Sequence, residues 1–213
     1  MAREACDFVT VIDETDLGGW LQKGNTLFHL NRFQESLECY RRCEATVAYP
    51  DLLQIFMGEC YEKLDDYTNA QKCYERALEI NPQNSEAWSG LGICGLELDT
   101  PEKSIEYLRK SLDLDAENFE TWVYLAEAYV NTNQVSDAEK AYKKSLKLEQ
   151  QQPDTWVALG NIYVDTAFYQ SALDCYLEAY NQDNSLENIN LLLAIAYYKL
   201  GEVEKALPLL HLA

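Results

Sequence analysis

Three tryptophans of this chain are separated by the same distance in sequence. Trp88, Trp122 and Trp156 stand 34 residues apart, and Trp20 precedes Trp88 by twice that interval. Because tryptophan is rare and bulky, a fixed interval between its occurrences is typical of repeated units rather than of one globular core. The spacing therefore predicts a series of 34-residue modules.

Other positions keep the same register. If position 1 of a repeat is the residue three places before each tryptophan, position 20 is always Ser or Ala and position 24 is always Tyr or Leu. Position 8 is always small: Gly24, Gly58, Gly92, Ala126, Gly160 and Ala194. We therefore predict one continuous solenoid whose repeats occupy residues 17–50, 51–84, 85–118, 119–152 and 153–186, with an incomplete repeat over 187–213.

Each repeat is predicted to form two helices. Positions 4, 7, 8 and 11 follow the helical period of one buried stripe, and positions 20, 24 and 27 repeat that spacing on a second helix. Small residues at positions 8 and 20 allow close packing, and aromatic residues fill the remaining space. We expect Asp51, Ser85 and Asp154 to cap helix N-termini. Pro208 is expected to kink or weaken the last helix.

These positions resemble the tetratricopeptide repeat, in which Trp-x2-Leu-Gly-x2-Tyr is followed by Ala, an aromatic residue, Ala and Pro. The clearest matches are Trp88–Leu91–Gly92 and Trp156–Leu159–Gly160–Tyr163. The resemblance covers residues 17–213 and implies an all-α fold, an α-solenoid of antiparallel helix pairs in a right-handed superhelix. Because a fold of this kind serves many functions, the function has to be argued from its surfaces.

The two ends of the sequence fall inside the repeat pattern. Residues 1–16 continue the register backwards and are interpreted as the trailing helix of an earlier repeat or as an N-terminal cap. The last residues are rich in leucine, whereas solenoid ends normally carry a polar cap. We favour a segment of a longer repeat protein. The alternative is a chain that self-associates through its apolar C-terminal helix.

The charged residues that give the net charge of −19 are unevenly distributed among the positions of the repeats. In tetratricopeptide arrays, positions 2, 5, 6, 9, 12 and 13 of the first helix face a concave groove, and here the charged residues at those positions are mostly acidic. The resemblance therefore implies an acidic groove that attracts a basic or amphipathic protein segment. The alternative is a solvated surface that only keeps the protein soluble. The predicted groove residues are Glu59, Glu62, Glu86, Glu97, Glu120, Tyr124, Glu127, Asn131, Asp154, Asn161 and Asp165.

Two binding functions are disfavoured by charge. The one basic cluster, Lys140, Lys143, Lys144 and Lys147, lies on a second helix and is interpreted as a solvated face, so we expect no nucleic-acid binding. Co-chaperones of this family bind a C-terminal carboxylate through Lys, Asn and Arg side chains. Here Asn25 matches that pattern, but Glu86 stands where lysine should attract the carboxylate.

No motif for catalysis, a cofactor or a metal emerges, and we expect no enzyme. The seven cysteines are interpreted as small helix residues. Cys39 and Cys43 lie four residues apart, but zinc would need two further ligands. Unpaired thiols favour a cytoplasmic location, and we expect no signal peptide or membrane span. The predicted function is a protein-interaction scaffold; the alternative is a targeting or regulatory region of a larger enzyme.

Overall fold

The computed structural model describes residues 17–43 and 49–211, and across these ranges every regular element is an α-helix. The all-α prediction is confirmed, and the helix expected within residues 1–16 lies outside the described residues. The first helices of the repeats are α2 (Leu17–His29), α4 (Pro50–Glu62), α6 (Ser85–Glu97), α8 (Phe119–Asn131), α10 (Pro153–Asp165) and α12 (Ile189–Lys199). The second helices are α3 (Phe33–Cys43), α5 (Tyr67–Ile80), α7 (Pro101–Leu114), α9 (Val135–Leu148), α11 (Tyr169–Gln182) and α13 (Val203–Leu210).

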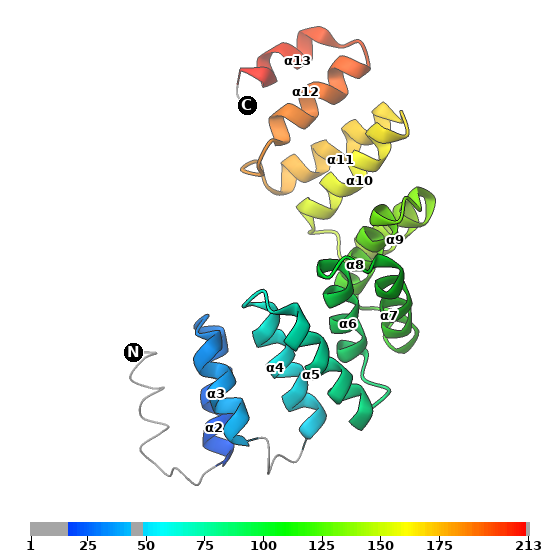
Figure 1. The fold of residues 1–213 in the computed structure, drawn as a ribbon. Coiled ribbons are helices and arrows are strands. Elements are labelled where there is room, and N and C mark those ends of the chain that lie inside the picture. The colour runs from blue at the N-terminus through cyan, green and yellow to red at the C-terminus, as the bar shows by residue number, and fades with distance from the viewer. Residues whose placement is uncertain (1–16, 44–48, 212–213) are drawn as a thin grey trace. The chain divides into compact units, whose positions relative to one another are not determined.

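The helices form two compact units. Unit 1 ends at Ala116 and contains α2 to α7, and unit 2 begins at Glu117 and contains α8 to α13. Within each unit, the two helices of a repeat run antiparallel, and the second helix contacts the first helix of the following repeat (Figure 1). This arrangement of stacked helix pairs confirms the predicted α-solenoid.

Glycine at position 8 allows the two helices of a repeat to approach closely. A Cβ atom added to Gly58 would lie 2.7 Å from the Cε1 and Cζ atoms of Tyr74, so the tyrosine ring occupies the space where a side chain would be. The same contact joins Gly24 with Tyr40, Gly92 with Leu108, and Gly160 with Tyr176. The small and large residues at positions 8 and 24 are therefore complementary parts of one contact.

The tryptophans pack in the interior of the repeats, and Trp88 and Trp156 also hold the connections that precede their repeats. Their side chains are half-buried. Trp88 Nε1 donates to the carbonyl of Pro82 over 2.9 Å, and Trp156 Nε1 donates to the carbonyl of Gln150 over 3.1 Å. Each acceptor lies six residues earlier, in the loop that leads into the repeat. The indole therefore fixes the loop as well as filling space.

The turn between the two helices of each repeat has a left-handed residue at position 15. Glycine adopts this conformation at Gly201, with a φ of 81°, and Asn or Asp does so in four repeats. Ala167 adopts it in repeat 5, with a φ of 63°. Alanine has neither the freedom of glycine nor a polar side chain that favours this region, so this turn carries backbone strain.

The expected helix caps were wrong. Ser85 and Asp154 lie within the first turns of their helices, and Asp51 follows Pro50, where α4 begins. The observed cap of α6 is Asn84, whose side chain accepts a hydrogen bond from the Ala87 N–H over 3.0 Å. Asn118 and Asp66 cap α8 and α5 in the same way. The cap therefore lies just before the helix, where its oxygen can reach the unpaired N–H groups of the first turn.

The last two helices are short. α12 begins at Ile189, after Asn188 in the left-handed region, and α13 contains Pro208 and ends at Leu210. None of the helices in the described ranges combines the length and the apolar character that a membrane crossing requires.

Candidate functional site

The predicted groove residues all lie on four first helices, α4, α6, α8 and α10. The structure brings seven of them together in two places, one in each unit. We name the first the α4–α6 cluster, which consists of Glu59, Glu62 and Glu86. The second is the α8–α10 pocket, which is lined by Phe119, Glu120, Val123, Tyr124, Glu127, Gln151, Gln152, Pro153, Asp154 and Thr155.

The α4–α6 cluster holds carboxylates that are partly removed from water. Glu59 and Glu62 are half-buried on α4, and Glu86 is exposed in the first turn of α6, a helix in contact with α4. Burial raises the pKa of Glu59, and the negative charge of Glu86 raises it further against the opposing effect of Lys63. The cluster therefore favours any cation that neutralises it.

Glu62 is the most strongly perturbed carboxylate of the cluster. Burial raises its pKa to about 7, with a smaller contribution from the charge of Glu59. The Tyr74 hydroxyl donates to Glu62 Oε1 over 2.8 Å and partly offsets this effect, as does the nearby Lys63. Near neutral pH, Glu62 is therefore poised to gain or lose a proton when a charged group arrives.

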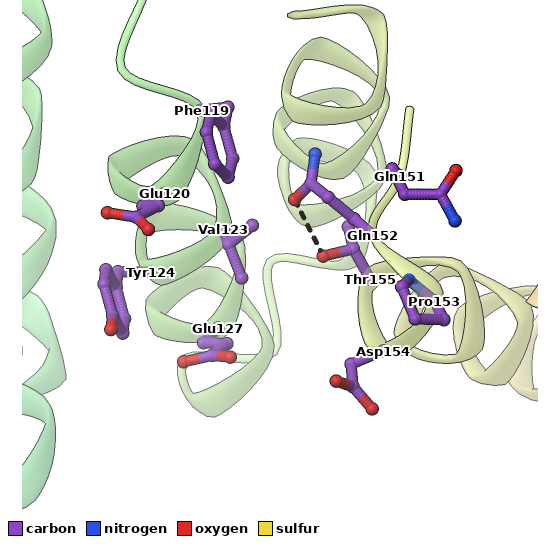
Figure 2. A pocket seen from close by; sticks show the side chains of 10 residues that line it. All are labelled: Phe119, Glu120, Val123, Tyr124, Glu127, Gln151, Gln152, Pro153, Asp154 and Thr155. Atoms are coloured by element: carbon purple, nitrogen blue, oxygen red, sulfur yellow. Dashed lines mark hydrogen bonds between the residues drawn. The ribbon is translucent and has the colours of Figure 1, made fainter. Parts of the chain in front are cut away.

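The α8–α10 pocket joins three acidic side chains to two aromatic ones, Phe119 and Tyr124. Glu120, Tyr124 and Glu127 project from α8, and Asp154 projects from the first turn of α10 (Figure 2). The pocket has a volume of about 370 Å³. All three carboxylates are exposed, whereas Tyr124 is half-buried. This combination can hold a cationic side chain against an aromatic surface.

Loop residues that the sequence analysis missed complete this pocket. Gln152 Oε1 accepts hydrogen bonds from Thr155 Oγ1 over 3.1 Å and from Ser145 Oγ over 3.0 Å. Gln151 and Pro153 lie beside it in the lining. The prediction considered first-helix positions and therefore omitted the loop that enters α10. The constant 34-residue period, which places a connection before each first helix, was the signal that could have identified it.

The remaining predicted residues belong to neither site. Asn131, Asn161 and Asp165 are exposed on α8 and α10 outside the pocket lining, and Glu97 is exposed on α6. Asn161 Oδ1 accepts a hydrogen bond from the Tyr176 hydroxyl over 2.7 Å. Its observed contact is therefore with the second helix of its own repeat.

The cysteines are packed in the helical core. All six within the described ranges are buried, and the Cys43 thiol donates to the Cys39 carbonyl over 3.3 Å. Burial raises the pKa of Cys60 to about 11 and that of Cys175 to about 12, so both thiols are protonated at neutral pH. Within the described ranges, no three His, Cys, Asp or Glu side chains are grouped as metal ligands.

Comparison with protein-family models gives three matches, each described as a tetratricopeptide repeat. They cover residues 17–45, 55–84 and 95–162, which together exceed half of the chain. Among curated proteins, the Protein CTR9 homolog of Arabidopsis thaliana is 32% identical over 74 residues. That match covers 34% of this chain and 7% of the relative, so the chain spans a small part of that protein's length.

Solved structures share the fold at low sequence identity. The pilF protein of Pseudomonas aeruginosa has a TM-score of 0.81 at 14% identity, with 96% of this chain and 90% of that chain covered. YrrB, described as a TPR protein with an unusual peptide-binding site, has a TM-score of 0.66 at 18% identity, with coverages of 93% and 100%. MamA has a TM-score of 0.67 at 22% identity, with coverages of 72% and 90%. Repeat proteins of this kind are usually scaffolds without enzymatic activity.

Proposed function

Because this chain belongs to the tetratricopeptide repeat family, whose members generally mediate protein–protein interactions, we propose that it is a scaffold that binds a basic or amphipathic protein segment along its first helices. The α8–α10 pocket is the observation that carries this proposal. Its lining combines three exposed carboxylates with the half-buried aromatic ring of Tyr124 within one unit. A lysine or arginine side chain fits both features, because its head pairs with carboxylates while its stem packs on the ring.

The α4–α6 cluster supports the same class of partner. Glu59 and Glu86 repel each other, and burial disfavours the charged forms of Glu59 and Glu62. A cationic side chain of the partner would relieve both penalties, whereas an acidic segment would increase them. The net charge of −19 also favours encounter with basic segments.

The proposal is tested with a defined probe. A fluorescein-labelled peptide of lysines and leucines at helical spacing is titrated with the full chain, and its anisotropy is measured. We expect saturable binding that weakens as salt is added. In the test variant, Glu120, Glu127 and Asp154 are all changed to Lys. We expect it to weaken binding at least about tenfold, because attraction becomes repulsion at the pocket.

A matched variant distinguishes binding at the pocket from attraction by the net charge of the chain. Glu178→Lys, Glu187→Lys and Glu204→Lys together make the same change in net charge at exposed positions of unit 2 outside the pocket lining. This control is expected to weaken binding by less than about threefold at physiological salt. Equal losses in the two triple variants would refute a specific site and leave a diffuse acidic surface.

A second candidate function is self-association through the apolar surface of α13. In repeats 1 to 5 the residue at position 24 is at most 3% exposed, whereas Leu210 in repeat 6 is 49% exposed. Leu207 beside it is 54% exposed. Sedimentation velocity of the full chain tests this candidate: a dimer should dissociate when both leucines are changed to Glu. A monomer at all concentrations would exclude it.

A further inference from the structure

A second pocket of unit 2 is lined by the second helices α9 and α11 together with the first helix α10. This α9–α11 pocket has a volume of about 370 Å³, and its lining includes Lys143, Lys147, Trp156, Leu159, Tyr163 and Cys175. None of these residues is among the predicted groove residues. The pocket therefore belongs to a different surface from the one to which the proposed function is assigned.

The pocket lies where repeat 5 lacks the two side chains that cover the tryptophan of repeat 3. In repeat 3, Tyr107 lies 5.8 Å from the Trp88 ring centre and Lys110 Nζ lies 4.6 Å from it. The equivalent residues of repeat 5 are Cys175 and Glu178. Cysteine is too short to cover an indole, and the negative face of the ring repels a carboxylate. Trp156 is therefore left beside an open space.

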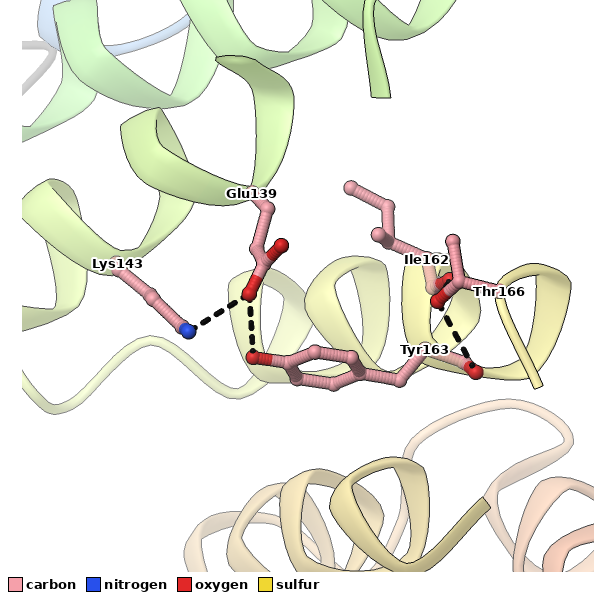
Figure 3. A network of polar contacts seen from close by, with 5 residues as sticks. All are labelled: Glu139, Lys143, Ile162, Tyr163 and Thr166. Carbon is pink, nitrogen blue, oxygen red and sulfur yellow. Dashed lines mark hydrogen bonds and ion pairs between the residues drawn. The ribbon is translucent and has the colours of Figure 1, made fainter. Parts of the chain in front are cut away.

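The walls of this pocket are apolar and fixed in place. Leu146, Leu159 and Cys175 are buried beneath it. The Trp156 indole N–H is bonded to the Gln150 carbonyl. The Tyr163 hydroxyl donates to Glu139 Oε1 over 3.0 Å (Figure 3). With their polar atoms engaged, the two rings offer mainly apolar surface to an incoming group.

The rim of the pocket is mostly basic. Lys143 and Lys147 stand on α9, and Asp174 on α11 is the acidic residue of the lining. Lys143 Nζ pairs with Glu139 Oε1 over 2.7 Å. Lys140 and Lys144 pair with Asp137 and Glu117.

Lys147 differs from the other three lysines of α9. It lies in the last turn of the helix, is exposed, and makes no ion pair with any described residue. Lys147 therefore places a positive charge without an ion pair to the described residues next to an apolar cavity, in a lining that also contains the carboxylate of Asp174.

We propose that the α9–α11 pocket is a second docking site, which takes an acidic protein segment bearing a large apolar side chain. That side chain enters between Trp156 and Tyr163, and a neighbouring carboxylate pairs with Lys147. Lys147 selects the acidic segment, because a basic segment would meet a lysine whose charge no ion pair with a described residue neutralises. The proposal does not depend on the groove, whose partner has the opposite charge.

The test is a titration of the full chain followed by NMR at the Trp156 indole N–H, which is assigned by comparison with Trp156→Phe. The probe is a blocked peptide with one phenylalanine flanked by aspartates, and the control peptide replaces the aspartates with lysines. We expect the acidic peptide to shift this signal saturably by about 1 mM, and the basic peptide to leave it unchanged. No shift with the acidic peptide, or equal shifts with both, would overturn the proposal.

Two exposed variants show whether the rim lysine selects the ligand. Lys147→Glu is expected to weaken the binding of the acidic peptide at least about fivefold. Lys140→Glu makes the same charge change on the same helix and should weaken this binding by less than about twofold. Equal effects of the two substitutions would show that the peptide responds to the overall charge of α9 rather than to a specific site at Lys147. Cys175→Tyr, which copies repeat 3, should block the shift, and circular dichroism monitors its folding.

Discussion

The Tyr74 hydroxyl donates a hydrogen bond of 2.8 Å to Glu62 Oε1, and this contact joins the core of repeat 2 to its acidic surface. Tyr74 packs in the space left by Gly58 and also contacts Gly90 of the next repeat. Tyrosines at the same repeat position reach Asn25 and Asn161 in repeats 1 and 5. The residue that closes the helix pair therefore also positions polar groups on the first helix.

The raised pKa of Glu62 makes stability depend on pH. Its pKa in the folded chain, about 7, is higher than the ordinary value of 4.5. The protonated form therefore favours folding, and this contribution is lost as pH rises from about 4.5 through 7. We expect Glu62→Gln to raise the free energy of unfolding by on the order of 1–3 kcal/mol at pH 8 and to change it little at pH 4.5. Urea denaturation at the two pH values measures this difference.

Glu102→Gln is the matched control, because Glu102 is exposed on α7 in the same unit. It removes the same charge from a chain with a large negative net charge. If both variants gain equal stability at pH 8, general charge repulsion accounts for the effect and the Glu62 environment does not.

Gly58→Ala tests the contact between positions 8 and 24. Alanine normally stabilises an open helix relative to glycine by about 1 kcal/mol. Here its Cβ would meet the Tyr74 ring, so we expect the variant to be destabilised by about 1–3 kcal/mol. Ala126, which has the same position in repeat 4 and belongs to one core cluster with Tyr142, is the comparison: Ala126→Gly should also destabilise, by about 1 kcal/mol. A more stable Gly58→Ala protein in thermal unfolding would contradict the packing account.

Ala167→Gly is expected to stabilise the chain. Ala167 has a φ of 63°, and glycine adopts that region without a Cβ clash. The free energy gained by relieving the strain exceeds the free energy lost to the greater entropy of the unfolded chain. We therefore expect the free energy of unfolding, measured by chemical denaturation, to rise by roughly 0.5–1 kcal/mol. Gln170→Gly, in the first turn of α11, should instead cost up to about 1 kcal/mol. The account of this turn fails if both substitutions change stability in the same direction.

Trp122→Ala is expected to destabilise the array without changing partner selection. The side chain is half-buried against the α8 to α10 core, so the cost should be about 3 kcal/mol, the low end for such a truncation. Below its melting temperature the variant should bind the lysine–leucine peptide within about twofold of the unaltered chain. A folded variant that no longer binds would show that the tryptophan also shapes the site.

The fold was predictable because its determinants recur. Glycine at position 8 and the large residue at position 24 are two sides of one contact, and the sequence shows both at the same interval. The left-handed turn also has a regular signal in the sequence, since Asn31, Asp65, Asp99 and Asn133 are spaced by 34 residues, although no prediction was made from it. The helix caps were misplaced because Asn84 and Ser85 can both cap, and the repeat register alone does not distinguish them.

The candidate sites were less predictable because they depend on how deeply each side chain is buried and on which residues surround it. The sequence predicted both Glu62 and Glu120 as groove residues. Glu62, however, is half-buried beside Tyr74, whereas Glu120 lines an open pocket. The α9–α11 pocket arises because Cys175 and Glu178 do not cover the ring of Trp156. That is apparent only once Trp88 is seen packed under Tyr107 and Lys110.

Site-specific photocrosslinking tests the central claim most directly, because it locates the bound segment. Benzoylphenylalanine replaces Tyr124 in the α8–α10 pocket in one protein and the exposed Tyr180 of α11 in another. Each is irradiated with the lysine–leucine peptide, and the products are identified by mass spectrometry. We predict crosslinking at position 124 that is lost when Glu120, Glu127 and Asp154 are changed to Lys, with little product at position 180. Equal crosslinking at both positions, or crosslinking at 180 alone, would contradict the proposal that the acidic first helices bind the partner.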